Sequence, residues 1–129
     1  MAYTSDMKAA ARRISQAAIK LDTSADRAVA AYLFGLAAEC ALKFVAARLP
    51  GGSVEAIQRA HFPELRTALR RLGGGRQSQG LRRLVESRGF MNQWAIPIRY
   101  ARKEDFQSRP LNEWRDHMTD ALNLMEGWS

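Results

Sequence analysis

The segment from residue 28 to residue 49 constrains the fold of this chain more than any other part of the sequence. It begins with eleven uncharged residues, 28–38, and then places Glu39 and Lys43 four positions apart among Ala, Cys, Leu and Phe. A helix that is apolar on most sides is buried in a protein core, where a charge is costly unless it is paired. The sequence therefore predicts a helical bundle whose central helix contains one polar site.

Apolar residues recur at helical spacing along most of the chain, and strand patterns are nearly absent. Ser5 or Asp6 is suited to cap the first helix, and Thr23 or Ser24 the second. Short connections between helices favour antiparallel neighbours. The predicted fold class is all-α, an antiparallel four-helix up-and-down bundle with extra short helices. The helices are expected over residues 5–21, 25–49, 54–60, 63–72, 78–87 and 111–125.

The composition is that of one soluble globular domain covering residues 1–129, with 47% hydrophobic and 26% charged residues. A single cysteine, Cys40, excludes an intramolecular disulfide and fits a reducing cytoplasm. A membrane span needs about 20 apolar residues, so the eleven-residue uncharged run predicts none. No apolar segment follows the basic residues near the N-terminus, so no secretory signal is expected.

The net charge of +7 is concentrated in the middle of the chain. Residues 59–88 contain eight arginines against two acids, whereas residues 104–129 contain six acids against two arginines. An arginine track can follow a phosphate backbone, but a solvated helix surface or a GC-rich genome produces the same pattern. No aromatic residue interleaves with the track, which counts against a stacking platform for single strands. The track consists of Arg66, Arg70, Arg71, Arg76, Arg82, Arg83 and Arg88.

Three segments resemble a known family of helical proteins. Residues 32–43 combine small apolar residues with Glu39 and then Lys43, and residues 94–100 contain Pro97, Arg99 and Tyr100 at the spacing Pro-x-Arg-Tyr. A third segment, residues 61–65, places His61 before a leucine-containing helix. These patterns are similar to those of the HEPN family, whose name stands for higher eukaryotes and prokaryotes nucleotide-binding.

The resemblance implies an antiparallel four-helix bundle that commonly forms a homodimer. Many prokaryotic members are toxins or their relatives, often encoded beside a minimal nucleotidyltransferase. Active members are metal-independent ribonucleases with an Arg, four to six residues and then a His. This chain departs from that motif, because Arg109 precedes His117 by eight positions and no Arg lies at the required spacing before His61. The resemblance therefore does not imply ribonuclease activity for this chain.

The candidate site residues allow two interpretations. In the first, Glu39 holds Arg99 in place, beside Tyr100, while Lys43 or Arg102 offers positive charge to a phosphate. In the second, Glu39 and Lys43 point outward to water, or Glu39 forms a structural ion pair with Arg99 while Tyr100 lies in the core. With one Cys and two isolated His, no metal site is expected. No glycine-rich phosphate loop is present, and no cofactor is predicted.

The leading functional hypothesis is a non-catalytic HEPN-like homodimer in a toxin–antitoxin or phage-defence system. It would bind RNA, a nucleotide phosphate or a nucleotidyltransferase partner. A first alternative is a metal-independent ribonuclease that uses an Arg with His117 or His61, because His suits proton transfer near neutral pH. A second alternative is an interaction module whose apolar central helix serves dimerisation.

Overall fold

The computed structural model describes residues 4–22 and 27–128, and within these ranges all regular secondary structure is helical. This confirms the prediction of an all-α fold. The long helices are α1 (Met7–Asp22), α2 (Arg27–Ala46) and α6 (Leu111–Glu126). The short α-helices are α3 (Glu55–Gln58), α4 (Glu64–Arg70) and α5 (Gln79–Val85). The 3₁₀ helices are η1 (Gly75–Ser78), η2 (Ile96–Tyr100) and η3 (Lys103–Ser108).

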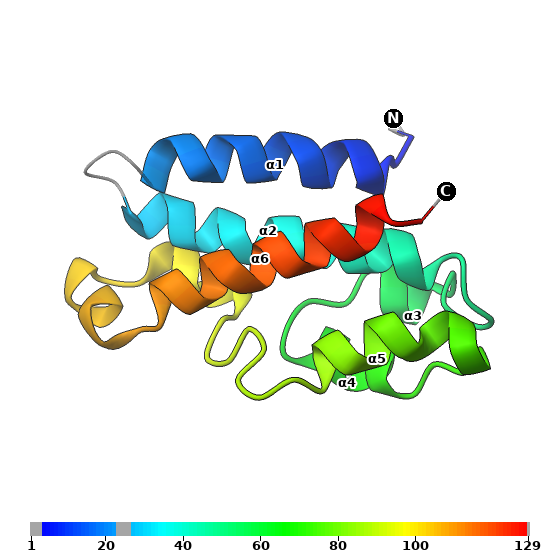
Figure 1. The fold of residues 1–129 in the computed structure, drawn as a ribbon. Helices are drawn as coiled ribbons and strands as arrows, with labels where there is room; N and C mark the ends of the chain where they lie inside the picture. Colours follow the sequence, from blue (N-terminus) through cyan, green and yellow to red (C-terminus); the bar gives the residue numbers. More distant parts are fainter. Residues whose placement is uncertain (1–3, 23–26, 129) are drawn as a thin grey trace.

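Helix α2 occupies the centre of the fold because it is apolar around most of its circumference. Helices α1 and α6 both pack against it (Figure 1). By length and composition α2 could cross a membrane, with a mean hydropathy of 1.6, but 61% of that stretch is buried inside the protein. Such burial is consistent with the core helix of a soluble protein.

The predicted four-helix up-and-down arrangement is not confirmed, because the described residues form three long helices. Between α2 and α6 the chain forms α3, α4 and α5, which have four to seven residues each and lie together on one side of the long helices (Figure 1). A left-handed backbone at Gly74, with φ of 119°, separates α4 from η1. Glycine tolerates this conformation and it ends a helix, so the segment cannot continue as one long helix.

The predicted cap of α1 is Asp6, whose Oδ1 accepts the backbone N–H of Ala9 at 3.0 Å. This bond satisfies one of the free N–H groups at the start of the helix. The predicted caps of α2, Thr23 and Ser24, lie outside the described residues.

A glycine in α2 fixes the segment that precedes η2. A Cβ atom added to Gly35 would come within 1.9 Å of the Trp94 ring, so only glycine lets this ring pack directly on the helix. The indole N–H of Trp94 donates to the carbonyl of Ala31 at 3.0 Å. Just before it, Met91 and Gln93 have φ of 49° and 69°, a strained conformation for residues with side chains. The packing of Trp94 on Gly35 and its hydrogen bond to Ala31 therefore hold a strained loop against α2.

Candidate functional site

The partner of Glu39 is His61. The Glu39 side chain is 2% exposed, and its Oε1 lies 2.8 Å from Nδ1 of His61. Its Oε2 accepts the backbone N–H of Phe62 at 2.7 Å. Burial raises the pKa of the Glu39 carboxyl, while the bonds from His61 and Phe62 and the positive charge of Lys43 act against that rise. The interpretation in which Glu39 points outward is therefore wrong.

The hydrogen bonds of Glu39 determine which ring nitrogen of His61 carries the proton. Oε2 accepts from Phe62, and in the carboxylate form of Glu39 the other oxygen, Oε1, can only accept as well, so we assign the proton to Nδ1 of His61. The other ring nitrogen, Nε2, then has a free lone pair, and the His61 side chain is 48% exposed. The following residue, Phe62, is held by edge-on contacts with Phe90 and Trp94, with ring centroids 5.8 and 6.0 Å apart. The imidazole is thus fixed at its base and open to solvent at its tip.

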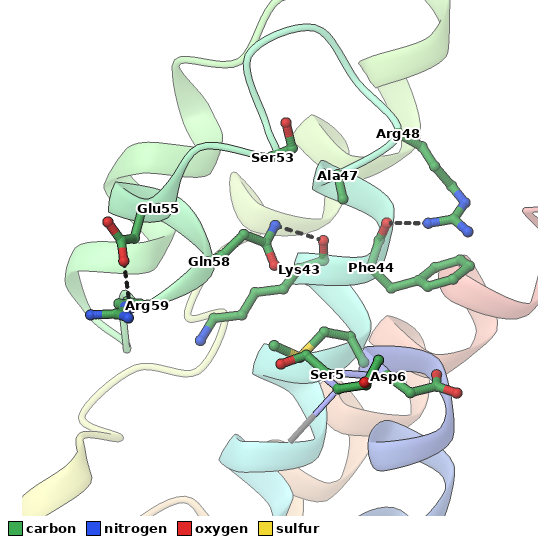
Figure 2. A pocket seen from close by; sticks show the side chains of 12 residues that line it. Ser5, Asp6, Lys43, Phe44, Ala47, Arg48, Ser53, Glu55, Gln58 and Arg59 are labelled. Atoms are coloured by element: carbon green, nitrogen blue, oxygen red, sulfur yellow. Dashed lines mark hydrogen bonds and ion pairs between the residues drawn. The ribbon is translucent and has the colours of Figure 1, made fainter. Parts of the chain in front are cut away.

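Lys43 lies one helical turn beyond Glu39 and is 5% exposed. Among the described residues, no ion pair or hydrogen bond involves its ammonium group. The side chain lines a groove of about 750 Å³ and extends from α2 past Gln58 (Figure 2). Lys43 is therefore a largely buried side chain, but its ammonium reaches solvent, because no buried side-chain nitrogen or oxygen in the described part of the chain lacks a hydrogen-bond partner.

The groove lies where the start of α1, the end of α2 and helix α3 meet. Gln58 closes one wall, because its Nε2 donates to the carbonyls of Lys43 at 3.1 Å and Gly52 at 3.0 Å. On another wall the guanidinium of Arg48 stacks 3.4 Å above the Phe44 ring centroid and donates to the Phe44 carbonyl. Figure 2 shows Lys43 and the Phe44–Arg48 stack extending to opposite sides of the groove.

The rim of the groove has both signs of charge. Arg59 pairs with Glu55 at 2.9 Å, and both side chains are well exposed. The Asp6 side chain also lines the groove but already caps α1. These acids are engaged with protein groups, so Lys43 and Arg48 are cations of the groove that form no ion pair among the described residues.

The predicted residues Arg99, Tyr100 and Arg102 do not join this site. Arg99 donates to the Tyr32 hydroxyl at 3.3 Å and lies 4.7 Å from the Tyr100 ring centroid. Since Tyr32 lies eleven residues before Lys43, the two contacts are separated by about 16 Å along α2. The predicted pairing of Glu39 with Arg99 is wrong. Tyr100 is 75% exposed, so its predicted core position is also wrong. Arg102 is exposed.

His117 has a structural environment. Its Nδ1 accepts the backbone N–H of Met91 at 3.0 Å, and its ring lies against Phe90 with centroids 5.2 Å apart. Burial lowers the pKa of His117, and nearby acids on its own helix oppose that effect. Arg66 adds a smaller lowering contribution to the pKa of His117, but its guanidinium donates to the carbonyls of Val85, Ser87 and Phe90. His117 therefore holds the strained loop.

Part of the arginine track is also structural. Besides Arg66, Arg82 donates to the carbonyl of Leu72 at 3.1 Å. In residues 4–22 and 27–128 there is no cluster of three His, Cys, Asp or Glu side chains that could hold a metal ion. In comparisons with known proteins, no family model, curated protein or solved structure matches this chain.

Two members of the site, Glu39 and Lys43, were predictable from the sequence, but the bond between Glu39 and His61 was not. The only sequence signal for that link was the unusual carboxylate on an apolar helix, which requires a buried partner without naming it. The sequence did not indicate that Gln58 or the Phe44–Arg48 stack would line the groove. The groove forms only through the path that the chain takes after α2.

Proposed function

We propose that this protein binds a phosphate-bearing ligand, a nucleotide or an RNA phosphate, in the groove lined by Lys43. The observation that supports this most directly is the Lys43 ammonium, which stands on a side chain that is 5% exposed, lines the groove and makes no hydrogen bond or ion pair with the described residues. Glu39, one turn away on α2, acts on Lys43 only through space. A phosphate in the groove would give this ammonium a charge-assisted acceptor in place of water.

The neighbouring groups fit a nucleotide. Glu39 is engaged with His61 and Phe62, so it does not neutralise Lys43 by direct contact. The Phe44–Arg48 stack offers a flat face of the kind on which nucleobases stack. A nucleotide would place its phosphate on Lys43 and its base toward that stack.

The broader setting of this proposal follows from the resemblance of residues 32–43 and 94–100 to the HEPN family. In that setting the chain is a cytoplasmic, HEPN-like four-helix bundle that forms a homodimer. It acts without catalysis in a toxin–antitoxin or defence system, alongside a nucleotidyltransferase partner. The alternative of a pure interaction module requires no ligand in the groove, and the Lys43 ammonium, which has no hydrogen-bond or ion-pair partner among the described residues, favours a ligand there instead.

The test replaces Lys43 by Met, which keeps the length and apolar stem but removes the charge. We expect Lys43→Met to weaken binding of ATP or of a short single-stranded RNA at least about tenfold, the value of one charge-assisted contact. The same variant should unfold at a temperature no lower than that of the wild type without ligand, because the ammonium makes no hydrogen bond or ion pair with the described protein groups. Calorimetric titration and thermal unfolding measure both effects.

The matched control is Lys103→Met, because Lys103 is exposed on η3. It should change neither ligand affinity nor melting temperature. If Lys43→Met lowers the melting temperature and leaves affinity unchanged, Lys43 has a structural role and the proposal is wrong.

A second candidate function is a metal-independent ribonuclease, and the Glu39–His61 pair is the observation that favours it. An imidazole fixed by a carboxylate is a common general base, and its Nε2 is exposed here. His117 fits this role less well, because its Nδ1 is occupied by a backbone N–H. Incubation of total RNA without metal, with the wild type and with a His61→Ala/His117→Ala double variant, decides this. Cleavage by the wild type alone would replace the non-catalytic proposal, and intact RNA in both would eliminate the ribonuclease.

A further inference from the structure

The geometry points to His61 as a phosphoryl-accepting histidine, with Nε2 as the nucleophile and Glu39 as its positioning residue. The inference rests on the proposed function only for its phosphoryl donor, a nucleoside triphosphate bound at Lys43. The two features that favour covalent chemistry are the tautomer of His61 and the charges around it.

The tautomer is the first argument. Glu39 accepts the hydrogen bond from Nδ1, so the lone pair of His61 resides on Nε2, the ring nitrogen that forms no hydrogen bond with a described protein group. His117 has the opposite arrangement, because its Nδ1 lone pair accepts the N–H of Met91 and its proton must reside on Nε2. Of the two histidines in the chain, only His61 therefore presents a free nucleophilic nitrogen to solvent.

The charges around the ring are the second argument. When Nε2 attacks phosphorus the imidazole becomes positively charged, and the buried Glu39 carboxylate at 2.8 Å stabilises that charge. The transferred group is an anion, and Lys43, one helical turn beyond Glu39 on α2, is the cation that the proposed function assigns to the phosphates of the donor. The Glu39–His61 pair itself supplies the nucleophile and the group that fixes it.

The reaction balances without a metal or a redox partner. The Nε2 lone pair of His61 forms a bond to the terminal phosphorus of the triphosphate, and the bond from that phosphorus to the bridging oxygen breaks. The nucleoside diphosphate leaves with the bonding electron pair. The Nδ1 proton stays in its hydrogen bond to Glu39, and no atom is oxidised or reduced.

The first experiment uses phosphoramidate, a small phosphoryl donor that needs no nucleotide site. Mass spectrometry locates the label on His61 or His117, and ³¹P spectroscopy identifies the ring nitrogen. We expect Nε2 of His61 in the folded protein to react about tenfold faster than the same residue in the urea-unfolded chain, the factor expected from one charge-assisted hydrogen bond. His117, in the same sample, should react more slowly folded than unfolded.

Two variants separate positioning from simple exposure. In Glu39→Gln the single amide oxygen still accepts the N–H of Phe62, so the amide NH₂ faces Nδ1 and forces the ring proton to Nε2. ¹⁵N spectra of His61 should show the inverted tautomer, and its labelling should fall about tenfold. His61→Asn keeps a donor to Glu39 and should fold normally without a label at this position.

The outcomes distinguish this inference from the proposed function. Two results would overturn the inference about His61. The first is labelling of His61 in the folded protein that is no faster than in the unfolded chain. The second is labelling that Glu39→Gln leaves unchanged although the tautomer of His61 has inverted. If nucleotide binding still depends on Lys43, the proposed function survives that result. If His61 is labelled rapidly by phosphoramidate but no nucleotide binds, the nucleophile stands and the phosphate site at Lys43 fails. With wild-type protein and ATP, transfer should give an acid-labile, base-stable label on His61.

Discussion

The two histidines of this chain are held in opposite protonation patterns, and the regions around them differ accordingly. His61 donates through Nδ1 to the buried carboxylate of Glu39 and leaves Nε2 exposed. His117 accepts at Nδ1 from the backbone of Met91 and packs against Phe90. The first arrangement leaves a lone pair for a ligand, whereas the second uses the lone pair to hold a loop.

The difference shows what distinguishes a functional polar residue from a structural one in a small helical fold. Around His117, each polar contact satisfies a backbone group that the strained loop would otherwise leave unpaired. Around His61, the fold buries the carboxylate of Glu39 on its most apolar helix, where an apolar residue would be more stable. A polar site that lowers the stability of the fold indicates that its residues are needed for something other than folding.

The largest expected effect comes from Gly35→Ala, which removes the support shared by both regions. The new Cβ would collide with Trp94, whose ring packs on Phe62 beside His61 and ends the loop that His117 holds. We expect a loss of about 3 kcal/mol in the free energy of unfolding, the upper range for overpacking. Urea denaturation measures it. Gly73→Ala is the matched control, because its Cβ meets nothing within 4 Å, and a similar loss there would refute the explanation.

The next largest effect separates the hydrogen bonds of Glu39 from its charge. Glu39→Ala leaves the buried N–H of Phe62 unsatisfied and should cost about 2 kcal/mol of stability. Glu39→Gln keeps that acceptor and should cost less. An equal loss in both variants would mean that the carboxylate charge and its bond to His61, and not the Phe62 contact, carry the stability.

The same residue predicts a pH dependence. Because burial raises the pKa of folded Glu39 above its ordinary value of 4.5, the unfolded state loses its proton first as the pH rises. The stability that Glu39 contributes is therefore complete below pH 4.5 and is lost as the pH rises through the folded pKa. Over that pH range the unfolding free energy of Glu39→Gln should rise relative to that of the wild type. A flat difference would contradict the burial effect.

The long helices were predictable from the sequence because their apolar periodicity extends over four or more turns. The polar site on α2 was predictable for the same reason, since Glu39 and Lys43 interrupt an otherwise apolar surface. The partner of Glu39 was not, because His61 lies 22 residues away and reaches it only through the path of the chain after α2. Arg99 was the wrong choice because Trp94, seated on Gly35, fixes η2 at the opposite part of the helix.

A smaller effect is expected at His117, on the acidic side of neutrality. Burial lowers the pKa of folded His117 below 6.5, so the unfolded state gains a proton first as the pH falls. The stability that neutral His117 contributes is complete above pH 6.5 and declines as the pH falls through the folded pKa.

Two variants test this pH dependence. His117→Asn keeps an acceptor for Met91 and should lessen the decline in stability at low pH. His117→Ala removes the acceptor and should cost about 1 kcal/mol at neutral pH. Denaturation between pH 5 and 8 would show both, and an unchanged slope in His117→Asn would assign the decline elsewhere.

The smallest effect is expected at Arg99, and it decides which end of α2 binds the ligand. Arg99 is exposed and contacts only Tyr32 and Tyr100 among the described residues, so Arg99→Ala should unfold at the same temperature as the wild type. If the groove at Lys43 is the binding site, nucleotide affinity and the labelling of His61 should also stay unchanged, since about 16 Å of helix separates the two places. A large loss of affinity in Arg99→Ala with full affinity in Lys43→Met would move the site to η2. That result would restore the sequence-based preference for Arg99 and leave the ammonium of Lys43 with solvent as its only hydrogen-bond partner.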